Sequence, residues 1–486
     1  MRKYVKLSLC FLLIAELFVQ AGHAQAVEKW DLRKCVDYAL KNNISIRQQD
    51  IQARLSALTY EQSQLSVYPT ANMSNSGGYQ FGRSINPTTN LFTNQAILFA
   101  NHSLNLGVDI FNWFSKKNTI AANKYFAEAA EANVDKARND IALNVANAYL
   151  QILLNAEQIK ISEVQVQQSI DQVNITNKQV NAGSLPELNL LELQTQLASD
   201  STTLITAQSN YTLSVLQLKA LLFISAEQPF EVDIPNVEQI PVDPIAELQP
   251  EDVYKLALTN LPQQKINNLR LQGAQKSVAA AKGALYPTLS AFGGLGTSYS
   301  TQQKQYVTSY TSTLLPIGKV TIPTGGTEYT VTTLQEQQVP ITYGKYGYFR
   351  QVSDNFNQNI GLSLRVPIFN GGQARTSWKR AQLNVKDVEA QRDLDAQTLK
   401  QNIYQAYTSA VAALQKFNSS QKSVTTADKA YTFAKKRYDI GLLNTIDLIT
   451  NQNNLFRAKI NLVSAQYDYV FKMKLLEFYK GQGLKL

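Results

Sequence analysis

The sequence predicts a mixed α and β membrane protein in which amphipathic β-strands are joined to very long helices. Three observations predict this fold class. Two segments alternate apolar and polar residues as strands of a membrane barrel do. Residues 115–180 have a helical apolar stripe without any proline or glycine, and the second half of the chain repeats the pattern of the first.

The composition disfavours several classes of function. The chain has 486 residues and a net charge of +9, but its lysines and arginines form no runs, so we expect a scattered solvated surface rather than binding to nucleic acid. Of the two cysteines only Cys35 lies beyond the apolar segment at the start of the chain, which excludes an internal disulfide framework. His102 is the only histidine in the same part of the chain, and no metal-ligand spacing, phosphate loop or nucleophile triad is present. We therefore expect neither an enzyme, nor a metal site, nor a cofactor.

Residues 1–24 have the features of a secretory signal peptide. Cations come first, the apolar segment 7–19 follows, and small residues mark cleavage after Ala24 or Ala26. Cys10 lies inside the apolar segment rather than at a lipoprotein cleavage site, so we expect no lipid anchor. No other stretch is apolar enough to span a bilayer as a helix, and an exported chain that enters a membrane without one must do so as a barrel.

The first structural repeat is expected over residues 25–222. It begins with a helical pattern over 31–64, continues with strands at about 68–112, and ends with a long helical hairpin at about 115–222. The break of this hairpin at Asn181–Pro186 contains both glycine and proline. Residues 223–249 hold four prolines and are expected to form an extended linker.

The second structural repeat is expected over residues 250–486. Tyr286-Pro287 matches Tyr68-Pro69 at an offset of 218, whereas the offset is 258 from the second strand to the hairpin. The difference of 40 places an insertion between the strands, so we expect strands at about 286–370, a long outer loop at 300–349 and a helical hairpin at about 373–480. The segment 359–368 has Ile360, Leu362, Leu364, Val366 and Ile368 on one side and Asn359, Gly361, Ser363, Arg365 and Pro367 on the other. Leu104, Leu106, Val108 and Ile110 repeat this pattern in the first half.

Four strands per chain are too few to close a barrel, and open strand edges are prohibitive in lipid. The chain is therefore expected to form oligomers, and three copies would supply twelve strands, which lies within the range of known membrane barrels.

The motifs at the ends of the long helices identify a family resemblance. The segment Val366–Gln373 is similar to the strand-to-helix signature of the TolC-like outer-membrane efflux proteins, also called outer membrane factors. Arg437–Gly441, followed by Thr445–Leu448, is similar to the signature of their periplasmic tip. The first half departs from the corner motif, because Trp113-Phe114 stands where Gly371-Gly372 stands in the second half.

This resemblance implies a homotrimer whose 12-stranded β-barrel continues into a periplasmic α-helical barrel in the cell outer membrane of a Gram-negative bacterium. Such a protein is a passive exit duct that docks onto a periplasmic adaptor protein and an inner-membrane transporter. The exported cargo would be drugs, other toxic compounds or metal ions, with type I protein secretion as the alternative. An exported helical stalk with a structural or adhesive role is a further alternative, but a stalk needs no lipid-facing strands.

The resemblance also implies functional positions. It places Asp447 at the pore constriction, with Thr450 where many relatives have a second acid and with Asn189 and Glu192 at the equivalent positions of the first half. The alternative for Asp447 is an acid that favours the dipole of its helix. The expected adaptor-docking tips, with exposed leucines, are Gly183, Ser184, Leu185, Gly441, Leu442 and Leu443. They could instead be only tight helix turns. The expected strand-to-helix corner consists of Pro367, Phe369, Asn370, Gly371 and Gly372.

Four aromatic residues lie just before the segment that is expected to form the last strand. They are Tyr343, Tyr346, Tyr348 and Phe349. They are expected either to form an interfacial girdle at the barrel rim or simply to pack within a loop.

Overall fold

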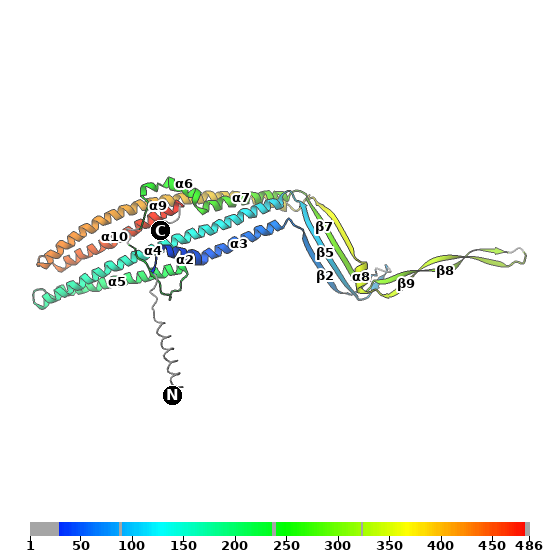
Figure 1. The fold of residues 1–486 in the computed structure, drawn as a ribbon, viewed down its shortest axis with the longest axis horizontal. Coiled ribbons are helices and arrows are strands. Elements are labelled where there is room, and N and C mark those ends of the chain that lie inside the picture. The colour runs from blue at the N-terminus through cyan, green and yellow to red at the C-terminus, as the bar shows by residue number, and fades with distance from the viewer. Residues whose placement is uncertain (1–28, 87–89, 236–239, 322–323, 482–486) are drawn as a thin grey trace, which may run out of the picture. The chain divides into compact units, whose positions relative to one another are not determined.

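The computed structural model of the chain describes residues 29–86, 90–235, 240–321 and 324–481 (Figure 1). The expected signal peptide lies outside these residues. The chain divides into two compact units, each made of segments distant in sequence. We call them the helical unit (Met1–Tyr60, Ala122–Gln275 and Leu383–Leu486) and the strand unit (Glu61–Ala121 and Lys276–Gln382).

Four long helices supply most of the helical unit. They form two hairpins, α4 (Ser115–Asn181) with α5 (Glu187–Leu222) and α9 (Gln373–Asp439) with α10 (Thr445–Tyr479). The helices α4 and α9 have 67 residues each, which at about 1.5 Å per residue gives a length of about 100 Å. Among the residues that the structure describes, no helix is long and apolar enough to cross a membrane.

The helical pattern at 31–64 forms two helices rather than one. The helices α2 (Leu32–Asn42) and α3 (Ile44–Leu65) are separated by Asn43, whose backbone is extended. The side chain of Asn43 accepts a hydrogen bond from the backbone N–H of Ser45 and donates one to the carbonyl of Leu221 in α5. Local side-chain bonding of this kind competes with continuation of the helix. In the second repeat, Leu261 likewise separates α6 (Pro250–Asn260) from α7 (Pro262–Gly283), where Pro262 begins the new helix.

Two hydrophobic cores reflect the sequence repeat. The first core contains α2, α4, α5 and α10, and the second contains α6, α9 and α10. Ala39 and Ala257, which are 218 positions apart, are both fully buried at matching places. Burial in the first core raises the pKa of the Cys35 thiol to about 12, so the thiol stays protonated at physiological pH.

The linker at 223–249 is fastened to the helices. Its strand β6 (Glu231–Val232) pairs in parallel with β1 (Lys29–Trp30). The hydroxyl of Tyr149 donates to the carbonyl of Asp233 at 2.6 Å, and the carboxylate of Glu477 accepts from the backbone N–H of Asp243 at 2.8 Å. A short 3-10 helix, η3 (Ile245–Glu247), leads into α6.

Four antiparallel strands form one sheet in the strand unit (Figure 1). They are β2 (Thr70–Gln80), β5 (Ile97–Phe111), β7 (Thr288–Ser300) and β10 (Asn357–Arg365), in the spatial order β10-β7-β5-β2. The strands β2 and β10 are therefore the edges of the sheet. A small hairpin of β3 (Arg83–Ile85) and β4 (Phe92–Asn94) lies between β2 and β5 in sequence.

The segment 300–349, expected as a loop, is instead largely a two-stranded ribbon. Its strands β8 (Lys304–Thr321) and β9 (Glu328–Lys345) pair along their length, and the short helix α8 (Tyr348–Asp354) follows them. The expectation was wrong because the missing helical period was interpreted as irregular structure. The segment is rich in Thr and Tyr, which favour strands.

Candidate functional site

The four-stranded sheet has one apolar and one polar face. Strand register places Leu104 beside Leu295, and Leu362 beside Ala291, on the same face. The apolar face carries Leu104, Leu106, Val108, Ala291, Leu295, Ile360, Leu362 and Leu364, and the polar face carries Asn72, Ser74, Asn101, Ser103, Asn105, Ser290, Asn359 and Ser363. Ile360 is 92% exposed. An exposed apolar surface of this extent marks a contact with lipid or protein.

Small residues keep the polar face open. A side chain at Gly294 would meet the Oδ1 atom of Asn359 at 2.6 Å, so glycine leaves room for that amide. Phe292 is an apolar exception on this face, and its ring lies across Gly361.

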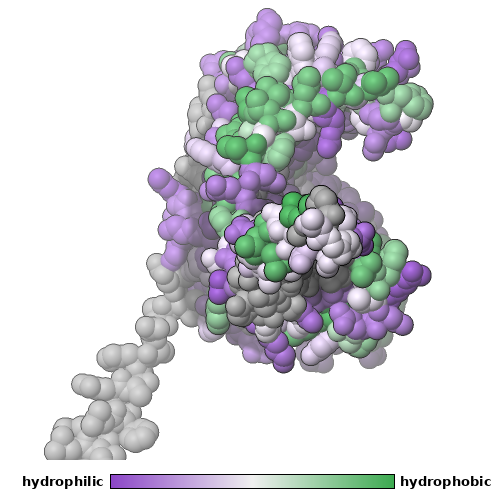
Figure 2. Space-filling model, turned by 90° about the vertical axis from the view of Figure 1, so that its right-hand side faces the viewer, coloured by the Kyte–Doolittle hydropathy of each residue, from purple (hydrophilic) through white to green (hydrophobic). Residues whose placement is uncertain are grey.

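Figure 2, seen from the end of Figure 1 at which β8 and β9 lie, shows hydrophobic residues gathered in several areas between hydrophilic ones.

The corner after β10 turns through two glycines in the left-handed conformation. Gly371 has φ +65° and Gly372 has φ +76°, and α9 begins at the next residue. The amide of Gln373 donates to the carbonyl of Asn370 at 3.3 Å. Phe369, just before the turn, is 86% exposed, and Pro367 lies between β10 and the turn.

The corner after β5 takes the same backbone conformation without glycine. Trp113 and Phe114, at the positions of Gly371 and Gly372 in the repeat, have φ +50° and +59°. The indole ring of Trp113 packs on Tyr286 with centroids 4.8 Å apart, and Phe111 contacts both rings of the turn. Aromatic packing therefore holds a conformation that costs ordinary residues about 1–2 kcal/mol each. Because Trp113 and Phe114 stand where the second half has glycines, the sequence did not show that the two corners share one backbone conformation.

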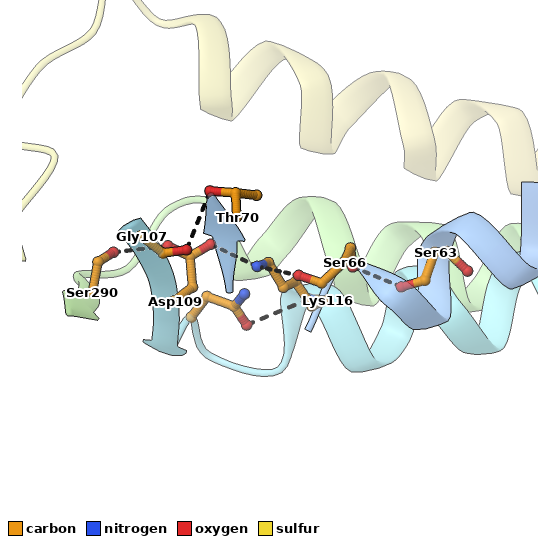
Figure 3. A network of polar contacts seen from close by, with 8 residues as sticks. Ser63, Ser66, Thr70, Gly107, Asp109, Lys116 and Ser290 are labelled. Carbon is orange, nitrogen blue, oxygen red and sulfur yellow. Dashed lines mark hydrogen bonds and ion pairs between the residues drawn. The ribbon is translucent and has the colours of Figure 1, made fainter. Parts of the chain in front are cut away.

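A polar network fastens the first corner to its neighbours (Figure 3). The ammonium group of Lys116 forms an ion pair with Asp109 at 2.9 Å and donates to the carbonyl of Ser66 at 2.7 Å. The hydroxyl of Ser290 donates to the same carboxylate at 2.7 Å. Lys116 thus links the start of α4 to the end of β5 and to the turn after α3, while Asp109 links β5 to β7.

Both helical hairpins turn at their tips through the same hydrogen-bonded motif. After α4, the amide of Ser184 donates to the carbonyl of Gln179, and Gly183 has φ +72°. After α9, the amide of Leu442 donates to the carbonyl of Arg437, and Gly441 has φ +76°. This is the Schellman ending of a helix, in which a left-handed residue allows the last carbonyls to be satisfied.

The exposed apolar residues of the tips differ from the expected set. Leu442 is exposed, but Leu185 and Leu443 are half-buried. Sequence alone could not separate these leucines, because a tight turn directs its neighbouring side chains differently. Other apolar side chains near the tips are exposed instead, namely Leu188, Leu191, Ile440 and Ile446.

Asp447 lies in the first turn of α10. Its backbone N–H donates to the side-chain oxygen of the N-cap residue Asn444 at 2.7 Å, and its side chain is exposed. The hydroxyl of Thr450 donates to the carbonyl of Ile446, so it serves its own helix. Asn189 and Glu192, the equivalent positions in α5, are half-buried. The structure thus places Asp447 where it can both favour the helix dipole and present a carboxylate to solvent.

A buried carboxylate near the tips escaped the sequence interpretation. Asp200 in α5 is 5% exposed and accepts hydrogen bonds from Ser169 at 2.5 Å and Gln196 at 2.8 Å. Gln452 of α10 donates to the same serine hydroxyl, and Gln196 exchanges two hydrogen bonds with Asn453. We call this set the Asp200 network, which joins the two hairpins. The repeat contains a signal for it, because Ala458 and Ala427 stand where Asp200 and Ser169 stand in the first half.

Within the described parts of the chain, no group of three or more His, Cys, Asp or Glu residues is placed to hold a metal ion.

Comparison with known proteins identifies similar sequences. The sequence model of the family described as outer membrane efflux protein matches residues 35–222 and 253–479. The outer membrane protein TolC of Escherichia coli (strain K12) is 23% identical over 376 residues, which cover 76% of this chain and 66% of TolC. Nodulation protein T of Rhizobium leguminosarum bv. viciae is 21% identical over 460 residues, covering 92% of this chain and 82% of that protein.

Solved structures share the fold. The outer membrane protein VceC of Vibrio cholerae superposes with a TM-score of 0.73 at 17% identity, covering 93% of this chain and 96% of VceC. The mixed α and β fold with high helical content is thereby confirmed.

The left-handed glycine at the second corner predicts a specific cost of substitution. A side chain at Gly372 would meet nothing within 4 Å, so Gly372→Ala changes only the backbone preference. We expect it to destabilise the folded protein by about 1–2 kcal/mol. The measurement is the thermal unfolding midpoint of the detergent-solubilised protein. Gly372→Asn is the matched control, since asparagine tolerates this conformation and should retain most of the stability. Equal losses for both variants would contradict the explanation.

The Asp200 network predicts non-additive substitutions. Asp200→Ala leaves a buried hydroxyl and amides without their acceptor and should lower the unfolding free energy by about 1–3 kcal/mol. The double variant Ser169→Ala with Asp200→Ala copies the residue pair of the second half and should recover part of that loss. Urea unfolding followed by the helical circular dichroism signal measures both, with Ser169→Ala completing the cycle. Strictly additive losses would show that the network has no coupling.

Proposed function

We propose that this chain, which belongs to the outer membrane efflux protein family, is the exit duct of a tripartite pump that exports small molecules. As a member of this family it is an outer-membrane protein that extends into the periplasm, and it is not an enzyme. A tripartite pump would supply the energy at the inner membrane, and the duct would act as a passive conduit. A periplasmic adaptor protein and an inner-membrane transporter would be its partners.

The two-faced sheet with two free edges is the observation that carries this proposal. The apolar face suits lipid, and the polar face of Asn and Ser suits a water-filled lumen. Because β2 and β10 are edge strands, a closed barrel requires further copies of the chain. We infer a homotrimer, in which three four-stranded sheets give a barrel of twelve strands.

The tips of the helical hairpins are the inferred sites of gating and docking. Asp447 has an exposed side chain, and three copies of it around a narrow entrance would form an acidic ring that favours cations. Glu192 is half-buried, so its share in such a ring would be smaller. The exposed side chains of Ile440, Leu442 and Ile446 give the tip an apolar surface that an adaptor protein could cover.

Removal of the Asp447 charge tests the constriction. Asp447→Asn should lower the cation-to-anion permeability ratio in planar bilayers by about fivefold, because about 1 kcal/mol of interaction at about 4 Å in water corresponds to that factor. The reversal potential in a salt gradient measures this ratio. Asp252→Asn on α6 is a control, since it removes an exposed acid far along the sequence from the tip. An unchanged reversal potential in the Asp447 variant would exclude it from the constriction.

If the tip docks an adaptor protein, a variant of the tip should lose transport in cells but keep conduction in bilayers. In a deletion strain, the wild-type gene should restore ethidium export and so lower the accumulation of ethidium. The Leu442→Glu variant should not lower it, while its single-channel conductance stays unchanged. Leu258→Glu, at an exposed leucine of α6, is the matched control and should still restore export. Full export by the Leu442 variant would contradict docking at this surface. A wild-type protein that neither conducts nor restores export would contradict the proposed function itself.

A further inference from the structure

A polar row crosses the apolar face of the sheet near the strand ends remote from the corners. Asn75, His102 and Thr297 are direct neighbours in register across β2, β5 and β7. Rows nearer the corners on the same face are mainly apolar. In the adjacent row Met73, Leu104 and Leu295 are neighbours, and Gln358 of β10 is the polar exception. Polar side chains facing acyl chains without partners would be costly, so this row needs either water or a cover.

The helix α8 covers the polar row. The two ring nitrogens of His102 lie 2.7 Å from the amide oxygen of Asn75 and 2.7 Å from the hydroxyl of Tyr348 in α8. The hydroxyl of Thr297 donates to the carbonyl of Val352, also in α8, at 2.6 Å. Because His102 and Thr297 project from the apolar face, α8 lies on that face and not on the polar one.

Side-chain amides fix α8 to the end of β7. The pairing of β10 with β7 ends at Asn357 and Gly296, which leaves the next residues of β7 without that neighbour strand. Gln351, which is fully buried, accepts from the backbone N–H of Ser300 and donates to its carbonyl. Asn355 donates to the carbonyl of Ser298 at 2.7 Å. These amides satisfy backbone groups that a membrane boundary would otherwise leave exposed.

The outward side of α8 combines an apolar ring with positive charge. Phe349 is 85% exposed, and Arg350 beside it has a side chain that is 63% exposed. Arg350 forms an ion pair with Asp354 at 3.8 Å. Two further cations are Lys304, which follows β7 in sequence, and Lys345, which precedes α8. They lie directly opposite each other in the β8–β9 pair.

The spacing along β7 matches the thickness of a membrane. From Leu289, at the corner end of the apolar face, to Tyr299, whose ring contacts Tyr348, the strand extends about 33 Å at about 3.3 Å per residue. A strand tilt of about 40° converts this length into about 25 Å, the usual height of the apolar band of an outer-membrane barrel. The helix α8 therefore lies at the level where acyl chains give way to headgroups.

We propose that α8 is an interfacial helix of the outer leaflet, in which Phe349 enters the acyl region and Arg350 with Lys345 binds the phosphate groups of anionic lipids. This inference rests on the proposed function, since it needs the apolar face of the sheet to contact lipid. The fixed attachment of α8 then sets the depth at which the outer end of the sheet meets the membrane surface.

Spin labels test the depth of α8 separately from insertion of the sheet. Nitroxides are attached to Phe349→Cys, Ile360→Cys and Leu442→Cys in full-length protein in which Cys10 and Cys35 are serine, and the protein is reconstituted in phosphatidylcholine–phosphatidylglycerol vesicles. Relaxation by oxygen, which enters lipid, is compared with relaxation by a water-soluble nickel chelate. The label at 349 should favour oxygen severalfold more than the tip label at 442, and less than the label in the apolar face at 360.

The outcomes distinguish the two proposals. A label at 360 that favours the chelate would overturn the membrane role of the sheet and the proposed function with it. The label at 360 can instead lie in lipid while the label at 349 is as accessible to the chelate as the label at 442. That result would overturn only the placement of α8.

The binding of lipid phosphate groups is tested by a separate measurement. Native mass spectrometry of protein extracted from those vesicles should show a severalfold loss of retained phosphatidylglycerol, relative to phosphatidylcholine, in the variant Lys345→Gln with Arg350→Gln. Lys319→Gln, which removes a cation paired with Glu328 on the ribbon, should leave the ratio unchanged. An unchanged ratio in the double variant would overturn the binding of lipid phosphate.

Discussion

The unpaired backbone edges of β2 and β10 determine how the four-stranded sheet can enter a membrane. The two strands have 11 and 9 residues, and about half of their backbone groups point away from the sheet. Each unpaired group in a bilayer costs several kcal/mol, so the edges together would cost more than the roughly 5–15 kcal/mol by which a domain is stable. A sheet with an apolar face and open edges is therefore compatible with lipid only when other copies complete it.

Duplication provides the remaining architecture, and the two halves depart from it at the corners and near the tips. Each repeat has a paired helix break, a 67-residue helix and a Schellman turn at the tip. At the corners, Trp113 and Phe114 hold with aromatic packing what Gly371 and Gly372 hold with backbone freedom. Near the tips, the first half places a buried acid, Asp200, between the hairpins, where the second half has Ala458.

The sequence allowed prediction of the features that have a strong period. The family resemblance is confirmed by the comparisons, and the glycines that end α4 and α9 could be located because a left-handed residue has a narrow choice of side chain. Tertiary contacts decided what could not be predicted. Asn43 breaks a helical pattern through its bond to Leu221, and the β8–β9 ribbon pairs strands that have no amphipathic signal. The tip leucines differ in exposure because of turn geometry, which hydrophobicity alone does not contain.

If the free edges force the four-stranded sheet to assemble into a closed barrel, the protein in its membrane must contain several chains. Native mass spectrometry of the full-length protein extracted from membranes in detergent measures the number of chains directly. We expect a complex with the mass of three chains. A particle with the mass of a single chain, in which the sheet and its apolar face are retained, would contradict it.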